Sequence, residues 1–257
     1  MKYIGLIIMF FSTSFVLAQE KLVESGVYKW NEKTVGMKNS FTKNLMVHGK
    51  TSDLEGFEVY AVSLLNGKNS VQKLSSDTSE VILIVKEGTL DVGLGNMHKS
   101  LTKGGVVYVL PGETYTVTNT GNKPTSCFLI SMNARKPADL KRGKDAGGSF
   151  MIDMEEQEFK PHDKGGSRNY FRDRPTAMFG FTEMHVTTLK PKIKSHEPHT
   201  HHAAEMILML SGQTEMQIGD GIYQATGGDF YFIDSEVSHA IRNTGDTPCV
   251  YVAFQWE

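Results

Sequence analysis

The sequence of 257 residues predicts an all-β protein made of two copies of one unit. Short apolar or alternating segments recur along the chain, and Gly, Pro and Asn turns separate them, as is typical of β-sandwiches and β-barrels. No long segment repeats apolar residues with a period of 3.6, so little helix is expected. Matching residues recur at one fixed spacing in the two halves, which predicts a duplicated fold.

The first 18 residues predict a secretory signal peptide. Lys2 precedes an apolar run over residues 4–17, and the small residue Ala18 ends a site that a signal peptidase would cut. A transmembrane anchor is the alternative, but the run is short and interrupted by Ser12-Thr13-Ser14. Gln19 would begin the mature chain. We therefore expect a periplasmic or secreted protein with no membrane segment after cleavage.

Charge and cysteine content exclude some classes of partner. The formal net charge is −2 and no basic block exists, so neither nucleic acid nor an anionic membrane surface is expected to bind. Cys127 and Cys249 are the two cysteines, and an exported protein could pair them. They lie in apolar segments far apart in the sequence, so two buried free thiols are the favoured interpretation.

The N-terminal unit is expected over residues 19–132. Its predicted strands cover residues 56–65, 79–88, 89–95, 104–112, 114–121 and 125–132. A polar segment rich in Gly and Lys follows and predicts a linker over 133–165. The C-terminal unit then covers residues 166–257.

A constant offset of 124 positions supports the duplication. Gly88 matches Gly212, and Asn119 matches Asn243 at the same offset. One offset held over many strands indicates two copies of one β unit. A single β-sandwich with coincidentally similar turns is the alternative.

Histidines cluster at the start of one apolar strand in the C-terminal unit. His199 and His201 are two residues apart, so they face the same side of an extended chain, and Glu205 keeps that parity. His239 follows on a later strand. Three imidazoles and one carboxylate that converge inside a small barrel suit a divalent first-row metal.

These residues resemble the first motif of the cupin superfamily. That motif reads His-x-His, three or four residues, Glu, six residues, Gly, and it fits His199, His201, Glu205 and Gly212. The resemblance implies two tandem cupin barrels (double-stranded β-helix, jelly-roll), that is, a bicupin. It also implies that His199, His201, Glu205 and His239 hold the metal.

The second cupin motif is also present, with two departures. Gly228, His239 and Asn243 stand at the motif's spacing. Asp234 and Glu236 stand where the family usually has Pro and Gly. These departures affect a turn and leave the ligands in place.

The offset of 124 predicts that the N-terminal barrel binds no metal. It relates the four ligands to residues that form no equivalent set, namely Ser75, Asp77, Val81 and Tyr115. Glu80 is adjacent to the glutamate position, but strand parity directs it to the other face. The N-terminal barrel is therefore expected to be a packing partner, a lid or a second ligand-binding surface.

Other residues are candidates for substrate contacts. Met209 and Ile241 share the parity of the ligands and would line an apolar wall. Arg168 could form a bidentate pair with a substrate carboxylate, although an exposed arginine in a turn is the simpler interpretation. His196 is expected at the barrel mouth, and His185 is expected to be an interior histidine with satisfied partners.

These features favour a metal-dependent enzyme acting on a small polar metabolite such as a sugar acid, of isomerase, lyase or hydrolase type. A non-catalytic sugar- or metal-binding module, a structural metal site and a dioxygenase are the alternatives. The layout resembles the ureidoglycine aminohydrolase group of cupins, whose ligands are Glu, His, His and Gln. Since export favours metal loading outside the cytosol, Zn²⁺ is expected, with Mn²⁺ or Fe²⁺ as alternatives. Edge strands make a homodimer plausible.

Overall fold

The computed structural model describes residues 22–30, 41–65 and 72–257. The predicted signal peptide and Gln19 lie outside the described residues. Within them the regular structure is β-strand, apart from one short helix, α1 (Leu140–Asp145), and one 3₁₀ turn, η1 (Met154–Glu156). The prediction of an all-β fold is confirmed. None of the described helices is long and apolar enough to cross a membrane.

The N-terminal barrel consists of two antiparallel sheets. The larger has the strand order β11-β8-β5-β10-β3-β2, and the smaller has the order β4-β9-β6-β7. The strands of the larger sheet are β2 (Phe41–Gly49), β3 (Leu54–Leu64), β5 (Glu80–Glu87), β8 (Val106–Val109), β10 (Thr125–Ala134) and β11 (Phe150–Ile152). Those of the smaller are β4 (Gln72–Ser75), β6 (Leu90–Leu94), β7 (Met97–Leu101) and β9 (Thr114–Thr118).

The C-terminal barrel repeats this plan. Its larger sheet has the order β1-β18-β15-β20-β14-β13-β12, and its smaller sheet has the order β17-β16-β19. The larger sheet contains β1 (Gly26–Tyr28), β12 (Lys160–His162), β13 (Gly165–Phe171), β14 (Thr182–Leu189), β15 (Ala204–Ser211), β18 (Phe230–Ile233) and β20 (Cys249–Trp256). The smaller contains β16 (Gln213–Ile218), β17 (Gly221–Thr226) and β19 (His239–Asn243).

The backbone geometry repeats with the offset seen in the sequence. Gly88 and Gly212 have φ values of 89° and 87°, and each turns the chain out of a central strand. A Cβ atom at Gly88 would meet Thr125, and one at Gly212 would meet Cys249, at less than 3 Å from the nearest atoms. Both positions therefore require glycine for conformation and for space.

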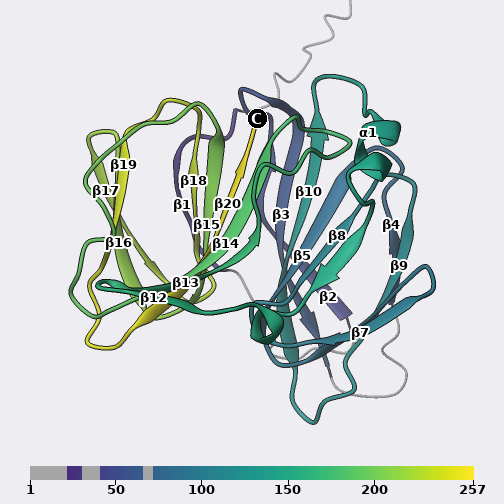
Figure 1. Ribbon diagram of the computed structural model, residues 1–257, viewed down its shortest axis with the longest axis horizontal. Helices are drawn as coiled ribbons and strands as arrows, with labels where there is room; N and C mark the ends of the chain where they lie inside the picture. Colours follow the sequence, from purple (N-terminus) through teal and green to yellow (C-terminus); the bar gives the residue numbers. More distant parts are fainter. Residues whose placement is uncertain (1–21, 31–40, 66–71) are drawn as a thin grey trace, which may run out of the picture.

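The two barrels lie side by side and pack their larger sheets against each other (Figure 1). Alternation along each strand sends one set of side chains into its own barrel and the other set into this interface. Aromatic rings fill the interface: Phe57 lies 5.4 Å from Phe232 and 6.1 Å from Trp256 between ring centroids. Trp256 is fully buried there.

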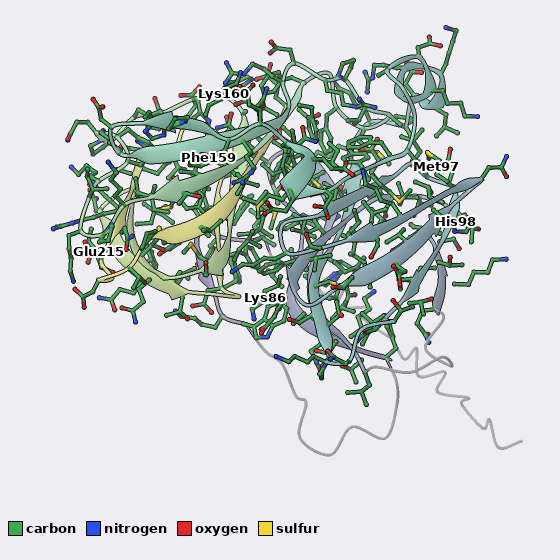
Figure 2. All side chains as sticks on the ribbon, turned by 60° about the horizontal axis from the view of Figure 1, so that its bottom comes forward. Lys86, Met97, His98, Phe159, Lys160 and Glu215 are labelled. Carbon is green, nitrogen blue, oxygen red and sulfur yellow. The ribbon has the colours of Figure 1, made fainter. Side chains whose placement is uncertain are left out.

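The chain passes between the two barrels at more than one place, and not only through a single linker. β1, near the beginning of the chain, pairs with β18 of the C-terminal barrel. β11, inside the segment expected to be a linker, pairs with β8 of the N-terminal barrel. Trp30 follows β1, and the Nζ of Lys86 lies over its ring, 5.1 Å from the ring centroid. Figure 2 shows Lys86 where the two barrels meet. The two halves are thus joined by strands from both directions.

Both cysteines are free and buried. Cys127 belongs to the apolar core inside the N-terminal barrel, and Cys249 belongs to the core inside the C-terminal barrel. They cannot pair across the interface from these positions, which agrees with the favoured interpretation of two buried thiols.

Candidate metal centre

Three histidines converge at one end of the C-terminal barrel. One ring nitrogen each from His199, His201 and His239 lies within 4.8 Å of the others. His239 begins β19, and His199 joins it through a pair of backbone hydrogen bonds of 3.0 and 3.2 Å. His201 lies three residues before β15. Among the described residues, this is the group of potential metal ligands that the fold brings together.

Backbone carbonyls orient two of the rings. The Nδ1 of His201 lies 2.8 Å from the carbonyl of Ala203, and the Nδ1 of His239 lies 2.9 Å from the carbonyl of Val237. A carbonyl can only accept, so each Nδ1 carries the proton and donates it. The Nε2 of each ring is then left with a free lone pair, which is the tautomer that a metal ligand needs.

Glu205 faces the same point. It is buried, and its Oε2 lies 3.0 Å from the Nε2 of His239 and 3.6 Å from the Nε2 of His201. Gln255 donates from Nε2 to the other carboxylate oxygen at 3.0 Å. Burial alone would raise the pKa of Glu205, but Gln255 and the His201 and His239 rings in their charged form outweigh it and lower the pKa.

The contacts at Glu205 fit a cation. The Nε2 of His239 is fully buried and forms no hydrogen bond of acceptable geometry, although a carboxylate oxygen lies 3.0 Å away. With Nδ1 protonated, two lone-pair donors face each other without a proton between them. Buried polar atoms rarely lack partners, and a shared cation would satisfy both. Three imidazoles and one carboxylate match the ligands of a divalent first-row metal.

The cluster remains in contact with solvent. His199 is exposed and His201 is partly buried, whereas His239 and Glu205 are buried. Partial burial and the neighbouring imidazoles of His196, His239 and His201 lower the pKa of His199, which favours the neutral form that binds metals. One side of the cluster is therefore buried in the barrel and the other opens at its mouth.

The strand register sets the residues beside the cluster. Glu183 on β14, Gln255 on β20 and Glu205 on β15 lie in one row across the inner face. In the next row His185 on β14 and Ile207 on β15 flank Ala253. The first row is thus polar on all three strands, and in the second row only β14 contributes a polar side chain.

Two residues that the sequence predicts to line an apolar wall lie inside the same barrel. Met209 and Ile241 are buried in its apolar core together with Ile207, on the inner face that their parity predicts. Met209 is fully buried, and the hydroxyl of Thr214 lies 3.3 Å from its sulfur. Their contact with a substrate stays a prediction.

Arg168 requires a correction. It lies opposite Val186 in the β13–β14 pairing, and Val186 belongs to the core between the barrels. Its guanidinium lies 5.0 Å from the ring of Phe159 and 3.8 Å from Glu155. Figure 2 labels Phe159 on this outer layer of the molecule. Arg168 therefore points away from the histidines. The sequence did not indicate which face of β13 carries its side chain.

Three further histidines of the C-terminal barrel lie in different environments. His196 lies at the mouth, with its ring centroid 4.4 Å from that of His199. His202 is exposed and lies 3.7 Å from Glu236. His185 lies inside the cavity, as its parity with Phe181 and Thr187 predicts, but its side chain is 29% exposed and its ion-pair partner is Glu183 at 3.5 Å. His185 is thus an interior residue with a partner, as expected, and it keeps some exposure.

Sequence reasoning missed Glu183 and Gln255. The signal that could have found Gln255 is the alternation of β20, since Cys249, Tyr251 and Ala253 face inward and Gln255 continues that series. Glu183 shares the parity of His185 in the same way. Neither residue belongs to the cupin motifs, so motif matching alone passes over them.

The N-terminal barrel lacks the ligand set. Val81 and Tyr115, at the positions related to Glu205 and His239, are buried in an apolar core that fills the barrel. Among the described residues, no metal-ligating group is found there. That the N-terminal barrel binds no metal stays a prediction.

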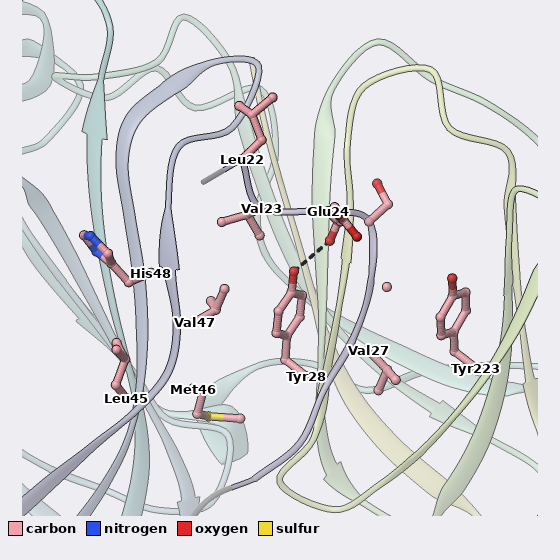
Figure 3. A pocket seen from close by; sticks show the side chains of 12 residues that line it. Leu22, Val23, Glu24, Val27, Tyr28, Leu45, Met46, Val47, His48 and Tyr223 are labelled. Atoms are coloured by element: carbon pink, nitrogen blue, oxygen red, sulfur yellow. Dashed lines mark hydrogen bonds between the residues drawn. The ribbon is translucent and has the colours of Figure 1, made fainter. Parts of the chain in front are cut away.

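A large surface groove lies elsewhere. It has a volume of about 650 Å³ and is lined by residues 22–28 and 45–48 and by Tyr223 (Figure 3). The hydroxyl of Tyr28 donates to the carbonyl of Glu24 at 2.8 Å within it. None of the clustered histidines lines this groove, so it is separate from the candidate metal centre.

Known proteins resemble this chain in sequence over one segment and in fold over most of its length. Residues 185–254 match the family model described as a cupin domain. The fold resembles that of the protein Ylba from E. coli, with a TM-score of 0.65, 17% identity and coverage of 94% of this chain and 95% of the other. It also resembles AerE from Microcystis aeruginosa, with a TM-score of 0.63, 11% identity and coverage of 87% and 95%.

Oxalate decarboxylase from Bacillus subtilis is a further structural relative, with a TM-score of 0.61, 12% identity and coverage of 80% and 69%. No curated protein matches the sequence. At these identities the likeness establishes the fold. Residues 185–254 therefore form a cupin domain, and the structure as a whole has the fold of two tandem jelly-roll barrels.

Proposed function

We propose that this protein is an exported, metal-dependent enzyme that acts on a small polar metabolite such as a sugar acid. The observation that carries the proposal is the opening of the histidine cluster at the barrel mouth. A metal that only stabilises the fold is normally enclosed by its ligands. Here His199 is exposed, so a small molecule could reach the ion.

The residues around the cluster would have three roles. His199, His201, Glu205 and His239 would hold the ion, and Gln255 would keep Glu205 in place through its hydrogen bond. When bound, a divalent ion polarises a carbonyl or carboxylate oxygen of the substrate. Ile207, Ile241 and Met209 would supply apolar walls and exclude water.

We propose Zn²⁺ as the native ion, with Mn²⁺ or Fe²⁺ as alternatives. A Sec-exported chain loads its metal outside the cytosol, where Zn²⁺ binds nitrogen ligands more tightly than Mn²⁺ or Fe²⁺ does. Three imidazole ligands favour this order. The proposed location, periplasmic or secreted, rests on residues 1–18. We also propose that the protein forms a homodimer through exposed edge strands. We propose no nucleic-acid or membrane partner.

The experiment that tests the proposal starts from metal content. The mature protein is purified from an exporting host without an affinity metal, beside His201→Ala and the matched control His202→Ala. We expect about one divalent ion per chain in the parent and in His202→Ala, and none in His201→Ala. A parent without metal would overturn the metal site.

Turnover then separates the enzyme from its alternatives. The loaded protein is incubated with a panel of hexuronates and aldonates, and products are followed by NMR. Turnover that disappears in His201→Ala supports the enzyme. Binding without turnover would favour a sugar-binding module, and oxygen consumption with an iron-loaded sample would favour a dioxygenase.

A further inference from the structure

Two ionisable side chains of the metal cavity belong neither to the ligand set nor to the cupin motifs. Glu183 and His185 lie on the inner face of β14, and the Nδ1 of His185 is 3.5 Å from Oε1 of Glu183. Their side chains are 14% and 29% exposed, so both are largely enclosed but not fully buried. Burying such polar groups costs free energy, and nothing in the packing of the barrel requires them.

Their place in the sheet brings them in front of the ligands. Glu183 is one strand removed from Glu205 in the same row, with Gln255 between them. His185 lies in the neighbouring row, and the residue between it and Ile207 is Ala253. His185 lies close enough to Glu205 to feel its charge. A ligand held by the histidine cluster would therefore approach the same inner face that carries His185.

The groups that face His185 make it able to exchange a proton. Burial lowers its pKa, Glu205 and Glu183 raise it, and Arg172 lowers it. Arg172 in turn lies 3.2 Å from Glu183. On the neighbouring strands Asn169 of β13 and Ala253 of β20 carry no charge. Its ring nitrogens form no hydrogen bond to any described residue other than the contact with Glu183, so Nε2 is free for a ligand.

We propose that His185, oriented by Glu183, is the general acid–base residue of this cavity. Nε2 of His185 takes a proton from the bound substrate and becomes an imidazolium, whose charge Glu183 stabilises at Nδ1. The same Nε2 then returns the proton to the substrate at a second atom or to its leaving group, so the imidazole ends neutral. The substrate class is therefore one whose reaction moves a proton between two of its own atoms or to its leaving group. This inference rests on the proposed enzymatic function.

The first test needs no substrate. Imidazole ¹⁵N signals are titrated by NMR in the metal-free full-length mature protein, with His185→Gln to assign the resonance. Glu183→Gln is expected to lower the titration midpoint of His185 by about one unit, and Arg172→Gln is expected to raise it. A midpoint that responds to neither variant would overturn the pairing. Opposite responses would not arise from a general loss of fold.

Loading with ¹¹³Cd²⁺ separates an acid–base residue from a ligand. Coupling between ¹¹³Cd and ¹⁵N is expected for His199, His201 and His239 and not for His185. Coupling to His185 would make it a ligand and overturn its proposed role. Loss of all coupling would instead refute the metal centre, so the two failures are distinguishable.

The last test uses whichever panel compound is turned over. His185→Gln is expected to lower kcat by about 10²–10⁴-fold with little change in KM or metal content. His185→Ala is expected to regain part of its activity with added imidazole, which a structural role would not allow. Full activity in His185→Gln would overturn the inference while leaving the metal-dependent enzyme intact.

Discussion

Asn119 in the N-terminal barrel and Asn243 in the C-terminal barrel, 124 positions apart, make equivalent pairs of hydrogen bonds. Asn119 donates to the carbonyls of Leu64 and Lys123 at 3.0 and 2.8 Å, and Asn243 donates to those of Leu189 and Thr247 at 3.0 and 2.9 Å. Both side chains are fully buried. The barrels therefore share the structural asparagine of one scaffold.

The two buried glutamates show how the barrels differ. Glu205 points into its barrel toward the histidines, whereas Glu80, on β5, points out of its barrel into the interface. Glu80 accepts hydrogen bonds from the hydroxyls of Tyr108 and Thr176 and from the backbone N–H groups of Ala177 and Met178. One carboxylate thus serves a site, and the other holds the chain that leads into β14.

The interiors differ in the same sense. The N-terminal barrel is filled by Val, Leu and aromatic side chains, which leave no room for a ligand among the described residues. The C-terminal barrel replaces part of that filling with histidines, carboxylates and Gln255. The two copies of the scaffold therefore share the order of their central strands and differ in what fills their interiors.

Removing the metal should produce the largest difference between the barrels. Chelation is expected to destabilise the C-terminal barrel by about 4 kcal/mol if the ion is normally present at about 1,000 times its Kd. Hydrogen exchange measured by mass spectrometry should show faster exchange in β15 and β19 and little change in β6 and β9. Equal deprotection of both barrels would contradict an ion confined to the C-terminal site.

The substitution Glu80→Ala should affect the interface. It leaves two buried backbone N–H groups and two hydroxyls without their acceptor, and we expect a loss of about 3 kcal/mol in the free energy of unfolding. Urea unfolding measures the loss. Glu87→Ala on the same strand is the matched control, because Glu87 is exposed, and it should change stability by less than about 0.5 kcal/mol. Similar effects of both variants would refute the role of Glu80.

The two asparagines offer a symmetric pair of variants. Asn119→Ala and Asn243→Ala should each cost about 2 kcal/mol of stability, since each removes two buried side-chain donors and one acceptor. Only Asn243→Ala should also weaken metal binding, because Asn243 ends the strand that His239 begins. Competition with a zinc indicator would test this. Weaker binding in Asn119→Ala would show that the barrels are coupled.

The smallest effect is expected at the turn where the cupin motif departs. Glu236 has φ 61° and Gly112, its counterpart in the N-terminal barrel, has φ 80°. This left-handed conformation costs a non-glycine residue about 1 kcal/mol. Gly112→Ala, whose Cβ would meet no atom within 4 Å, should therefore lose about 1 kcal/mol. Glu236→Gly should gain about 0.5 kcal/mol, after the glycine's greater freedom when unfolded is subtracted.

Thermal unfolding of these two variants would measure both changes. A neutral Gly112→Ala would mean that the left-handed conformation costs little in this turn. A destabilised Glu236→Gly would mean that the Glu236 side chain contributes more than the strain it imposes. In the second case its contact with His202 at the barrel mouth would become the next position to substitute.

The sequence by itself determined the features that depend on local order. Alternation placed Met209 and Ile241 on the inner face and directed Glu80 outward, since successive side chains of a strand face opposite sides. The spacing of His199, His201 and Glu205 predicted that these side chains would face one point. The offset of 124 predicted the second barrel and its different interior, because a duplicated unit keeps its turns even when its core changes.

Only the tertiary structure decided the features that depend on distant pairing. Nothing local indicates that β1 pairs with β18, or that Arg168 lies on the face of β13 opposite to His185. Glu183 and Gln255 reach the metal cavity because β14, β20 and β15 are neighbours in a sheet, although the chain orders them otherwise. Strand order and register are set by long-range burial of two sheets against each other, and parity along one strand carries no information about them.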